Sequence, residues 1–186
     1  MKDTPLPNSK HADFTLVLVD GHVHIYACHD IDQVLDGAWR HFKGVADSYG
    51  TSDFQGVLIL TESAGDQVFG DLVQCTRRTV GRWYVLETRE SCSLSLQRDD
   101  GARLLLLAGR QLVSQEKLEL SAYFLTETLA DGAPLTALLE QVHRLGGLSV
   151  LPWGVGKWFG PRGREVAAQL RRHAAPLLLS DNGGRP

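Results

Sequence analysis

The sequence lacks the features that mark a secreted or membrane-spanning protein. Its 186 residues contain only three cysteines, Cys28, Cys75 and Cys92, an odd number without paired spacing. This pattern favours reduced thiols in a cytoplasmic protein over a disulfide framework. No apolar run approaches the roughly 20 residues of a membrane-spanning helix, and residues 1–13 contain no apolar signal core. We therefore expect no membrane association and a flexible tail over residues 1–13.

Several signatures of catalysis and binding are also missing. There is no Walker phosphate loop and no Gly-x-Ser-x-Gly nucleophile elbow. Basic residues are not interleaved with aromatic residues over a broad face, so nucleic-acid binding is not favoured. Positive charge is concentrated in residues 134–186, which have a net charge of +4, whereas the remainder has −7. This basic part could favour an anionic ligand, although Arg171 and Arg172 could simply solvate a helix face.

The composition is that of an ordinary globular protein. The chain is 43% apolar and 22% charged, with a net charge of −3. A chain of this length can bury about 70% of the surface that it exposes when unfolded, so it needs no disulfide or metal for stability. We expect residues 14–186 to form a single α/β domain.

Hydrophobic periodicity predicts strands and helices that alternate in two parts of the chain. Residues 14–20 and 55–61 are apolar runs typical of buried parallel strands, and residues 32–49 between them follow helical spacing. This β-α-β unit implies a right-handed crossover, with functional groups at the carboxyl ends of the strands. Residues 82–124 instead predict an antiparallel section of short strands. Further elements are expected at residues 66–74 (helix), 134–145 (helix), 148–151 (strand), 164–173 (helix) and 176–180 (strand).

The end of the first predicted strand contains the most suggestive motif, Asp20-Gly-His22-Val-His24. Because alternate side chains of a strand share one face, both imidazoles could reach one zinc, manganese or iron ion. Asp20 could add a ligand or accept a hydrogen bond that orients a histidine. The alternative is that the pair is a surface or core coincidence, since His-x-His is common. His29 follows closely and is a weaker candidate.

Two further acids end predicted strands. Glu62 follows residues 55–61 and could bridge a metal or act as a general base, or could instead cap a helix amide. Asp181 follows residues 176–180 and could be a ligand or proton acceptor. Asp181 also begins an Asp-Asn-Gly-Gly segment, which is an ordinary turn sequence.

A glycine-rich loop at residues 154–163 could bind an anion. Its glycines let backbone amides approach a ligand, and it precedes the amino end of a predicted helix. Lys157 and Arg162 would supply positive charge, assisted by Arg164, and Trp153 and Trp158 would form the walls of a phosphate or carboxylate pocket. A purely structural loop packed by its tryptophans is the alternative.

The order of these elements resembles the polymerase-and-histidinol-phosphatase (PHP) family. That family opens with Asp-x-His-x-His, which here is residues 20–24, and later has a helix, a Gly-Gly pair and an apolar strand, which here is residues 142–151. Gly109-Arg110-Gln111 stands at the place of a family Gly-x-Glu, and residues 177–183 resemble a later strand that ends in an acid or an Asn-Gly pair. The resemblance implies a distorted α/β barrel with a metal cluster that activates water for hydrolysis, often of phosphoesters.

The chain departs from the family at several of these positions. Gln111 replaces the bridging Glu, Pro152-Trp153 replaces a His-Pro turn, and the closing Asp-x-His motif is absent. Barrels of this type usually exceed about 200 residues, so we expect a distorted or incomplete TIM-like (PHP-type) barrel. Truncation of the chain at its carboxyl end is one explanation that stays open.

These observations predict a metal-dependent, phosphoesterase-like hydrolase. Its metal ligands would be His22, His24 and Asp20, its catalytic acids Asp181 and Glu62, and its substrate-binding residues Lys157, Arg162 and Trp153. The substrate would be a small anion. The alternatives are a degenerate PHP-like binding or scaffold protein and a fragment of a larger hydrolase. The sequence leaves the oligomeric state open.

Overall fold

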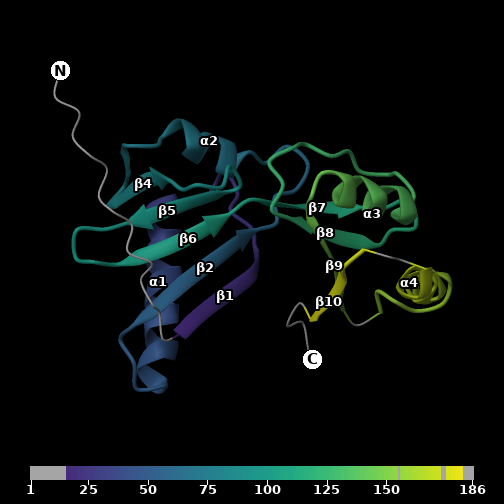
Figure 1. Ribbon diagram of the computed structural model, residues 1–186, viewed down its shortest axis with the longest axis horizontal. Coiled ribbons are helices and arrows are strands. Elements are labelled where there is room, and N and C mark those ends of the chain that lie inside the picture. Colours follow the sequence, from purple (N-terminus) through teal and green to yellow (C-terminus); the bar gives the residue numbers. More distant parts are fainter. Residues whose placement is uncertain (1–15, 155, 173–174, 182–186) are drawn as a thin grey trace.

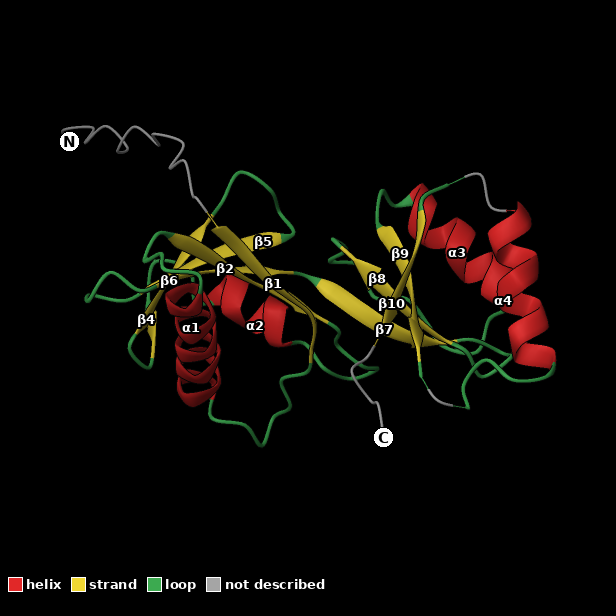
Figure 2. Cartoon of the chain, turned by 90° about the horizontal axis from the view of Figure 1, so that it is seen from below, coloured by secondary structure: helices red, strands yellow, loops and turns green. Residues whose placement is uncertain are grey.

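The chain folds into two β-sheets, and two helices cover the outer side of each (Figures 1 and 2). The structure, a computed structural model, describes residues 16–154, 156–172 and 175–181, so the expected tail at residues 1–13 lies outside the described residues. The helices are α1 (Ile31–Ser48), α2 (Val68–Gln74), α3 (Leu135–Arg144) and α4 (Pro161–Arg172). The strands are β1 (Leu16–Val23), β2 (Phe54–Leu60), β3 (Thr79–Val80), β4 (Trp83–Glu87), β5 (Ser93–Gln97), β6 (Arg103–Leu107), β7 (Gly109–Val113), β8 (Glu119–Tyr123), β9 (Leu148–Trp153) and β10 (Leu177–Asp181).

The first sheet has the strand order β1-β2-β6-β5-β4-β3. Strands β1, β2 and β6 are parallel, whereas β5, β4 and β3 continue the sheet in antiparallel pairs. Helix α1 begins where the Asp30 carboxylate accepts hydrogen bonds from the first free backbone amides, as an N-cap does. Its apolar stripe and that of α2 pack on one face of the sheet, with Leu35, Phe42, Phe69 and Leu72 buried against the strands.

The second sheet has the order β10-β9-β8-β7, with β9 and β10 parallel and the other pairs antiparallel. Helices α3 and α4 cover its outer face, as Figure 2 shows. The spacing of this segment predicts a buried stripe of Leu135, Leu138, Leu139, Val142 and Leu145; the first four are fully buried there, whereas Leu145, just after the end of α3, is 40% exposed.

The two sheets join along β2 and β7. Ala108 alone separates β6 from β7, and Glu62, two residues after β2, forms a parallel bridge with Arg110. A third apolar cluster lies between the sheets and unites side chains of β2, β8 and β9, namely Val57, Ile59, Tyr123 and Val150. The carboxyl ends of β1 and β2 therefore lie beside the second sheet, and this junction positions the candidate site.

The predicted TIM-like, PHP-type barrel is wrong. The described residues form two small, mostly antiparallel sheets with four helices and no closed barrel, whereas a barrel of that type has eight parallel strands, each followed by a helix. The chain between α2 and α3 supplies only strands and loops. Without helical crossovers, successive strands there pair antiparallel, as the prediction for residues 82–124 already indicated.

Strand β1 also differs from expectation. It was predicted to be buried on both faces, but it is the end strand of its sheet, and Val17 and Val19 remain 56% and 55% exposed. Its parallel pairing with β2 is confirmed. None of the described helices is long and apolar enough to cross a membrane.

Gly109 lies at the point where β2, β7 and β8 meet, and we expect it to be intolerant of a side chain. An added Cβ would lie 2.3 Å from the Leu60 carbonyl oxygen and 3.2 Å from that of Ala122, and both are backbone atoms of paired strands. Gly109→Ala should lower the free energy of unfolding by about 1–3 kcal/mol, measured by urea denaturation.

The matched control for Gly109 is Gly44→Ala in α1, where an added Cβ meets nothing within 4 Å. Removing a glycine from a helix interior should raise stability by up to about 1 kcal/mol. Equal effects of the two substitutions would contradict the close approach at the sheet junction.

Candidate functional site

The two imidazoles of the Asp-x-His-x-His motif converge. The Nε2 atoms of His22 and His24 are 3.1 Å apart, with ring centroids 4.9 Å apart and an interplanar angle of 73°. His24 Nε2 also lies 3.4 Å from Thr61 Oγ1, at the end of the neighbouring strand β2. The prediction that both rings project from the end of the first strand toward one point is therefore confirmed.

Asp20 does not support the imidazoles in the predicted way. The register between β1 and β2 shifts by one residue between Asp20 and Val23, which is a β-bulge and breaks the simple alternation of side chains. Asp20 Oδ1 instead accepts a hydrogen bond of 3.1 Å from the backbone N–H of His22. Its carboxylate thus stabilises the bulge that presents His22.

The electrostatic surroundings favour a neutral His22. Burial, followed by the neighbouring His24, lowers the pKa of His22. Glu119 at the start of β8 and Lys157 in the loop after β9 both act on the pKa of this ring, in opposite directions, and the two side chains form an ion pair with each other. A neutral imidazole is the form that binds a metal ion.

Polar groups line the space between the sheets on the same side. Gln111 and Ser121 are direct partners in the β7–β8 pairing, so their side chains share a face, and Glu119 and Tyr123 share it by alternation along β8. The Tyr123 hydroxyl donates to the Gly21 carbonyl oxygen, which ties this face to β1. Among the described residues, Gln111 Oε1, Ser121 Oγ and His24 Nδ1 are buried without a hydrogen-bond partner.

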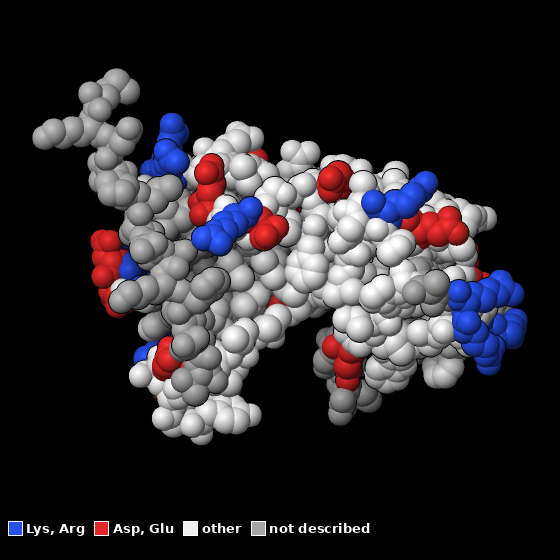
Figure 3. All heavy atoms as spheres, in the orientation of Figure 1, with Lys and Arg blue, Asp and Glu red and all other residues white. Residues whose placement is uncertain are grey.

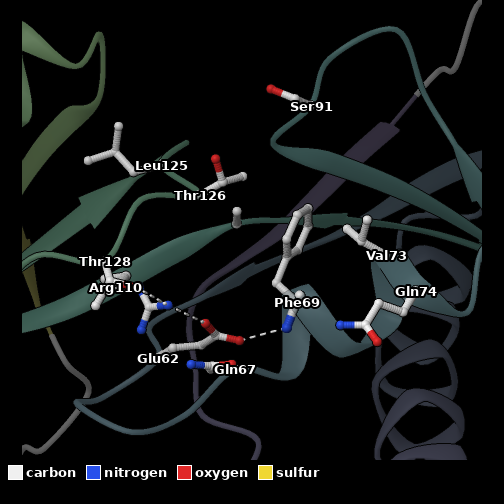
Figure 4. Close-up of a pocket in the computed structure, with 12 residues that line it drawn as sticks. Glu62, Gln67, Phe69, Val73, Gln74, Ser91, Arg110, Leu125, Thr126 and Thr128 are labelled. Atoms are coloured by element: carbon white, nitrogen blue, oxygen red, sulfur yellow. Dashed lines mark hydrogen bonds and ion pairs between the residues drawn. The ribbon is translucent and has the colours of Figure 1, made fainter.

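Glu62 is not brought to the imidazoles. It follows Thr61, whose hydroxyl faces His24, and points into a separate pocket shown in Figure 4. There Glu62 Oε1 accepts from the backbone N–H of Phe69 at 2.7 Å, and Oε2 lies 3.6 Å from Arg110 Nη2. The helix-amide alternative considered for Glu62 is therefore what the structure shows.

The burial of Glu62 predicts a pH dependence of stability. Burial raises its pKa, outweighing the opposing effects of the Phe69 N–H and Arg110. The folded state therefore holds the Glu62 proton more tightly than the unfolded state. The contribution of protonated Glu62 to the free energy of unfolding is fully present at low pH. It is lost as pH rises through the raised pKa. Glu62→Gln should remove this decline, measured as the free energy of unfolding between about pH 4 and pH 7.

The control for this pH experiment is Glu87→Gln, because Glu87 is an exposed residue of β4. Its substitution should leave the pH profile close to that of the natural protein. If the free energy of unfolding of Glu62→Gln and of the natural protein changed with pH in the same way, this would contradict the raised pKa of Glu62.

The predicted anion-binding residues are only partly available. Lys157 is paired with Glu119, and Arg162 Nη2 donates to the Gly156 carbonyl oxygen at 3.0 Å. Trp153 ends β9 and is exposed, whereas Trp158 packs partly buried against the core of the second sheet. Lys and Arg side chains gather over α4, away from the junction of the sheets, as Figures 1 and 3 show. The charge of the basic part of the chain therefore lies mainly on a solvent-facing helix.

Two candidates remain, one on β10 and one before α1. Asp181 ends β10 opposite Trp153 and is exposed. His29 is exposed and accepts a hydrogen bond of 3.3 Å from the Tyr26 N–H, so it caps a turn before α1.

The geometry of the imidazole pair fits one metal ion. Two nitrogens bound to a tetrahedral ion at roughly 2.0–2.1 Å lie about 3.3 Å apart, close to the 3.1 Å between His22 and His24. The described residues do not include a group of three or more His, Cys, Asp and Glu side chains arranged to hold a metal. The two imidazoles would therefore supply two of the metal ligands. Neutral oxygen atoms of the protein or water would supply the others.

Sequence reasoning did not single out Thr61, Glu119, Ser121 or Tyr123. The available signal was the polar face of residues 117–124, where Glu119 and Ser121 alternate with Leu118 and Leu120. Such alternation usually indicates a solvent-facing side, but here that side faces the junction of the sheets.

Comparisons with protein-family models, with curated proteins and with solved structures find no match to this chain. The site must therefore be interpreted from its own geometry.

Proposed function

We propose that this protein is a metal-dependent hydrolase whose metal ion is held by His22 and His24. The observation that carries the proposal is the 3.1 Å separation of the two Nε2 atoms, in surroundings that keep His22 neutral. A divalent zinc, manganese or iron ion bound there would lower the pKa of water and supply a nucleophile at neutral pH. The resemblance of residues 20–24 to the PHP motif supports the same chemistry, without the barrel.

The chain's own residues would divide the remaining roles. Glu119 acts on the pKa of His22 and is a better-placed proton acceptor than Glu62, which faces the separate pocket. Lys157, paired with Glu119, could hold a small anionic substrate such as a phosphoester. Gln111 Oε1 and Ser121 Oγ, buried without partners among the described residues, could accept or orient water in the same space.

The test is hydrolysis of p-nitrophenyl phosphate after loading with each metal in turn. Activity should require metal and be lost in His22→Ala. Glu119→Gln should lower kcat by at least about 100-fold while metal content is kept, because it removes a proton acceptor and no ligand. Unchanged activity in His22→Ala would overturn the proposal.

A second candidate is a binding or scaffold protein without turnover. It is favoured by the neutral Gln111 and by the lack of a third His, Cys or acidic ligand among the described residues. Metal binding without hydrolysis of phosphate, sulfate and carboxylate esters would support it. The three cysteines are unpaired, which supports a cytoplasmic location for either candidate.

A further inference from the structure

A cavity of about 470 Å³ lies beside the end of β2 and the start of β7 (Figure 4). Glu62 lines it, whereas the preceding residue, Thr61, faces the imidazoles. The cavity is lined by residues of α2, of the loop after β8 and of the start of β7. Its size is within the usual range for small-molecule sites, roughly 300–1,000 Å³. It shares no lining residue with the imidazole pair, so what it binds is independent of the hydrolase proposal.

The floor of the cavity is a buried pair of opposite charges. Glu62 and Arg110 are only 6% and 8% exposed, and Figure 4 shows both side chains turned toward the cavity. Their closest approach, 3.6 Å between Glu62 Oε2 and Arg110 Nη2, is longer than a hydrogen bond of roughly 2.7–3.2 Å. The other carboxylate oxygen, Oε1, is already used by the Phe69 N–H. Glu62 Oε2 can therefore accept a hydrogen bond from a ligand.

The Arg110 guanidinium also has N–H donors that could bind a ligand. A guanidinium carries five N–H donors, but toward the described residues Arg110 donates only to the Asp66 carbonyl oxygen, at 3.2 Å, and to Thr128 Oγ1, at 3.5 Å. Burying a charged pair costs free energy unless its hydrogen bonds are completed. A ligand with an acceptor for Arg110 and a donor for Glu62 would complete both sets.

The walls above this charged floor are partly apolar. Phe69 and Val73 of α2 lie on one side and Leu125 on another, with Thr126 beside Leu125. A ligand therefore needs an apolar part of moderate size next to its charged groups.

We propose that this cavity binds a free α-amino acid with an apolar side chain. The ligand carboxylate pairs with the Arg110 guanidinium, in the planar geometry that suits a carboxylate. The ligand ammonium group donates to Glu62 Oε2, and the ligand side chain packs against Phe69, Val73 and Leu125. The charges of Glu62, the ligand ammonium group, the ligand carboxylate and Arg110 then alternate in sign. Each charged side chain gains a closer partner than the 3.6 Å contact between Glu62 and Arg110.

The test is isothermal titration of the full chain with L-leucine and L-phenylalanine, compared with analogues that each lack one charge. Leucinamide keeps the ammonium group without the carboxylate, and N-acetyl-L-leucine keeps the carboxylate without the ammonium group. Each analogue should bind at least about tenfold more weakly than L-leucine, because each loses a charge-assisted hydrogen bond.

Two variants locate the site. Arg110→Gln should remove the preference for L-leucine over leucinamide, and Arg103→Gln, at an exposed position of β6, should keep it. Because Arg110→Gln disturbs a buried pair and could impair folding, Thr126→Trp provides a second variant. It fills the cavity from an exposed position and should weaken L-leucine binding at least about tenfold.

The proposal is overturned if neither amino acid binds at 10 mM, if the amide and N-acetyl analogues bind as well as L-leucine, or if Thr126→Trp leaves binding unchanged. Each of these results leaves metal binding at His22 and His24 untouched, so the two proposals fail separately.

Discussion

Asp36→Ala should lower the free energy of unfolding by about 3 kcal/mol or more, because it removes a buried carboxylate that accepts three hydrogen bonds and leaves the buried Trp83 N–H without a partner. Asp36 is 8% exposed and accepts from Trp83 Nε1 at 3.0 Å and from Arg98 Nη1 at 2.5 Å. Arg82 Nη2 donates to it as well. This carboxylate therefore ties α1 to β4 and to the end of β5.

The burial of Arg98, which loses one of its carboxylate partners, contributes to the size of the expected loss of stability. The Arg98 side chain is only 14% exposed, and its guanidinium carbon lies 5.0 Å from the Trp39 ring centroid and 5.2 Å from that of Trp83. It cannot move into water without giving up these contacts, although Asp100 still pairs with it. Urea denaturation followed by circular dichroism measures the loss.

Asp47→Ala in the same helix is the matched control for Asp36→Ala. Asp47 pairs with Lys43 at 2.7 Å, four residues earlier, and both side chains are well exposed. Such a pair contributes about 0.3–0.5 kcal/mol. A similar loss for the two substitutions would contradict the idea that the Asp36 cluster stabilises the first sheet.

His22→Ala and His24→Ala should each weaken zinc binding by more than about 100-fold, because each removes one of two ligands that converge to 3.1 Å. Competition with a chromogenic chelator measures the affinity, and elemental analysis of the purified protein measures the metal content. The control is His41→Ala, since His41 is an exposed histidine of α1.

The separation of the two imidazoles also suits a hydrogen bond between neutral rings. If the pair of imidazoles formed only this hydrogen bond, the natural protein would bind zinc no better than either alanine variant. This result would show that the pair does not bind a metal ion. Retention of tight binding in only one of the variants would show that the two rings do not share an ion.

Local patterns predicted the elements well. The bounds expected for α1, β2, α3 and β9 lie within about two residues of those observed, because the buried stripes and the glycines that end them are local signals. The convergence of His22 and His24 was expected from their alternate positions at the end of one strand, although the bulge after Asp20, which presents His22, was not expected.

The failures all involve partners far away in the sequence. Whether β1 lies in the middle or at the end of its sheet depends on where later strands pair. The sequence of residues 14–20 does not indicate that pairing. The bulge after Asp20 and the turn of Glu62 away from the imidazoles depend on the register with β2 and β7. The barrel was predicted from a resemblance in the order of elements, but the part of the chain that the structure describes has too few helical crossovers to form it.

The central claim is that His22 and His24 together hold one metal ion at the junction of the two sheets. The most direct measurement is anomalous X-ray scattering at the zinc edge from crystals of the zinc-loaded protein. The account predicts one strong peak within bonding distance of both Nε2 atoms. A peak on any other residues, or no peak at stoichiometric zinc, would contradict it.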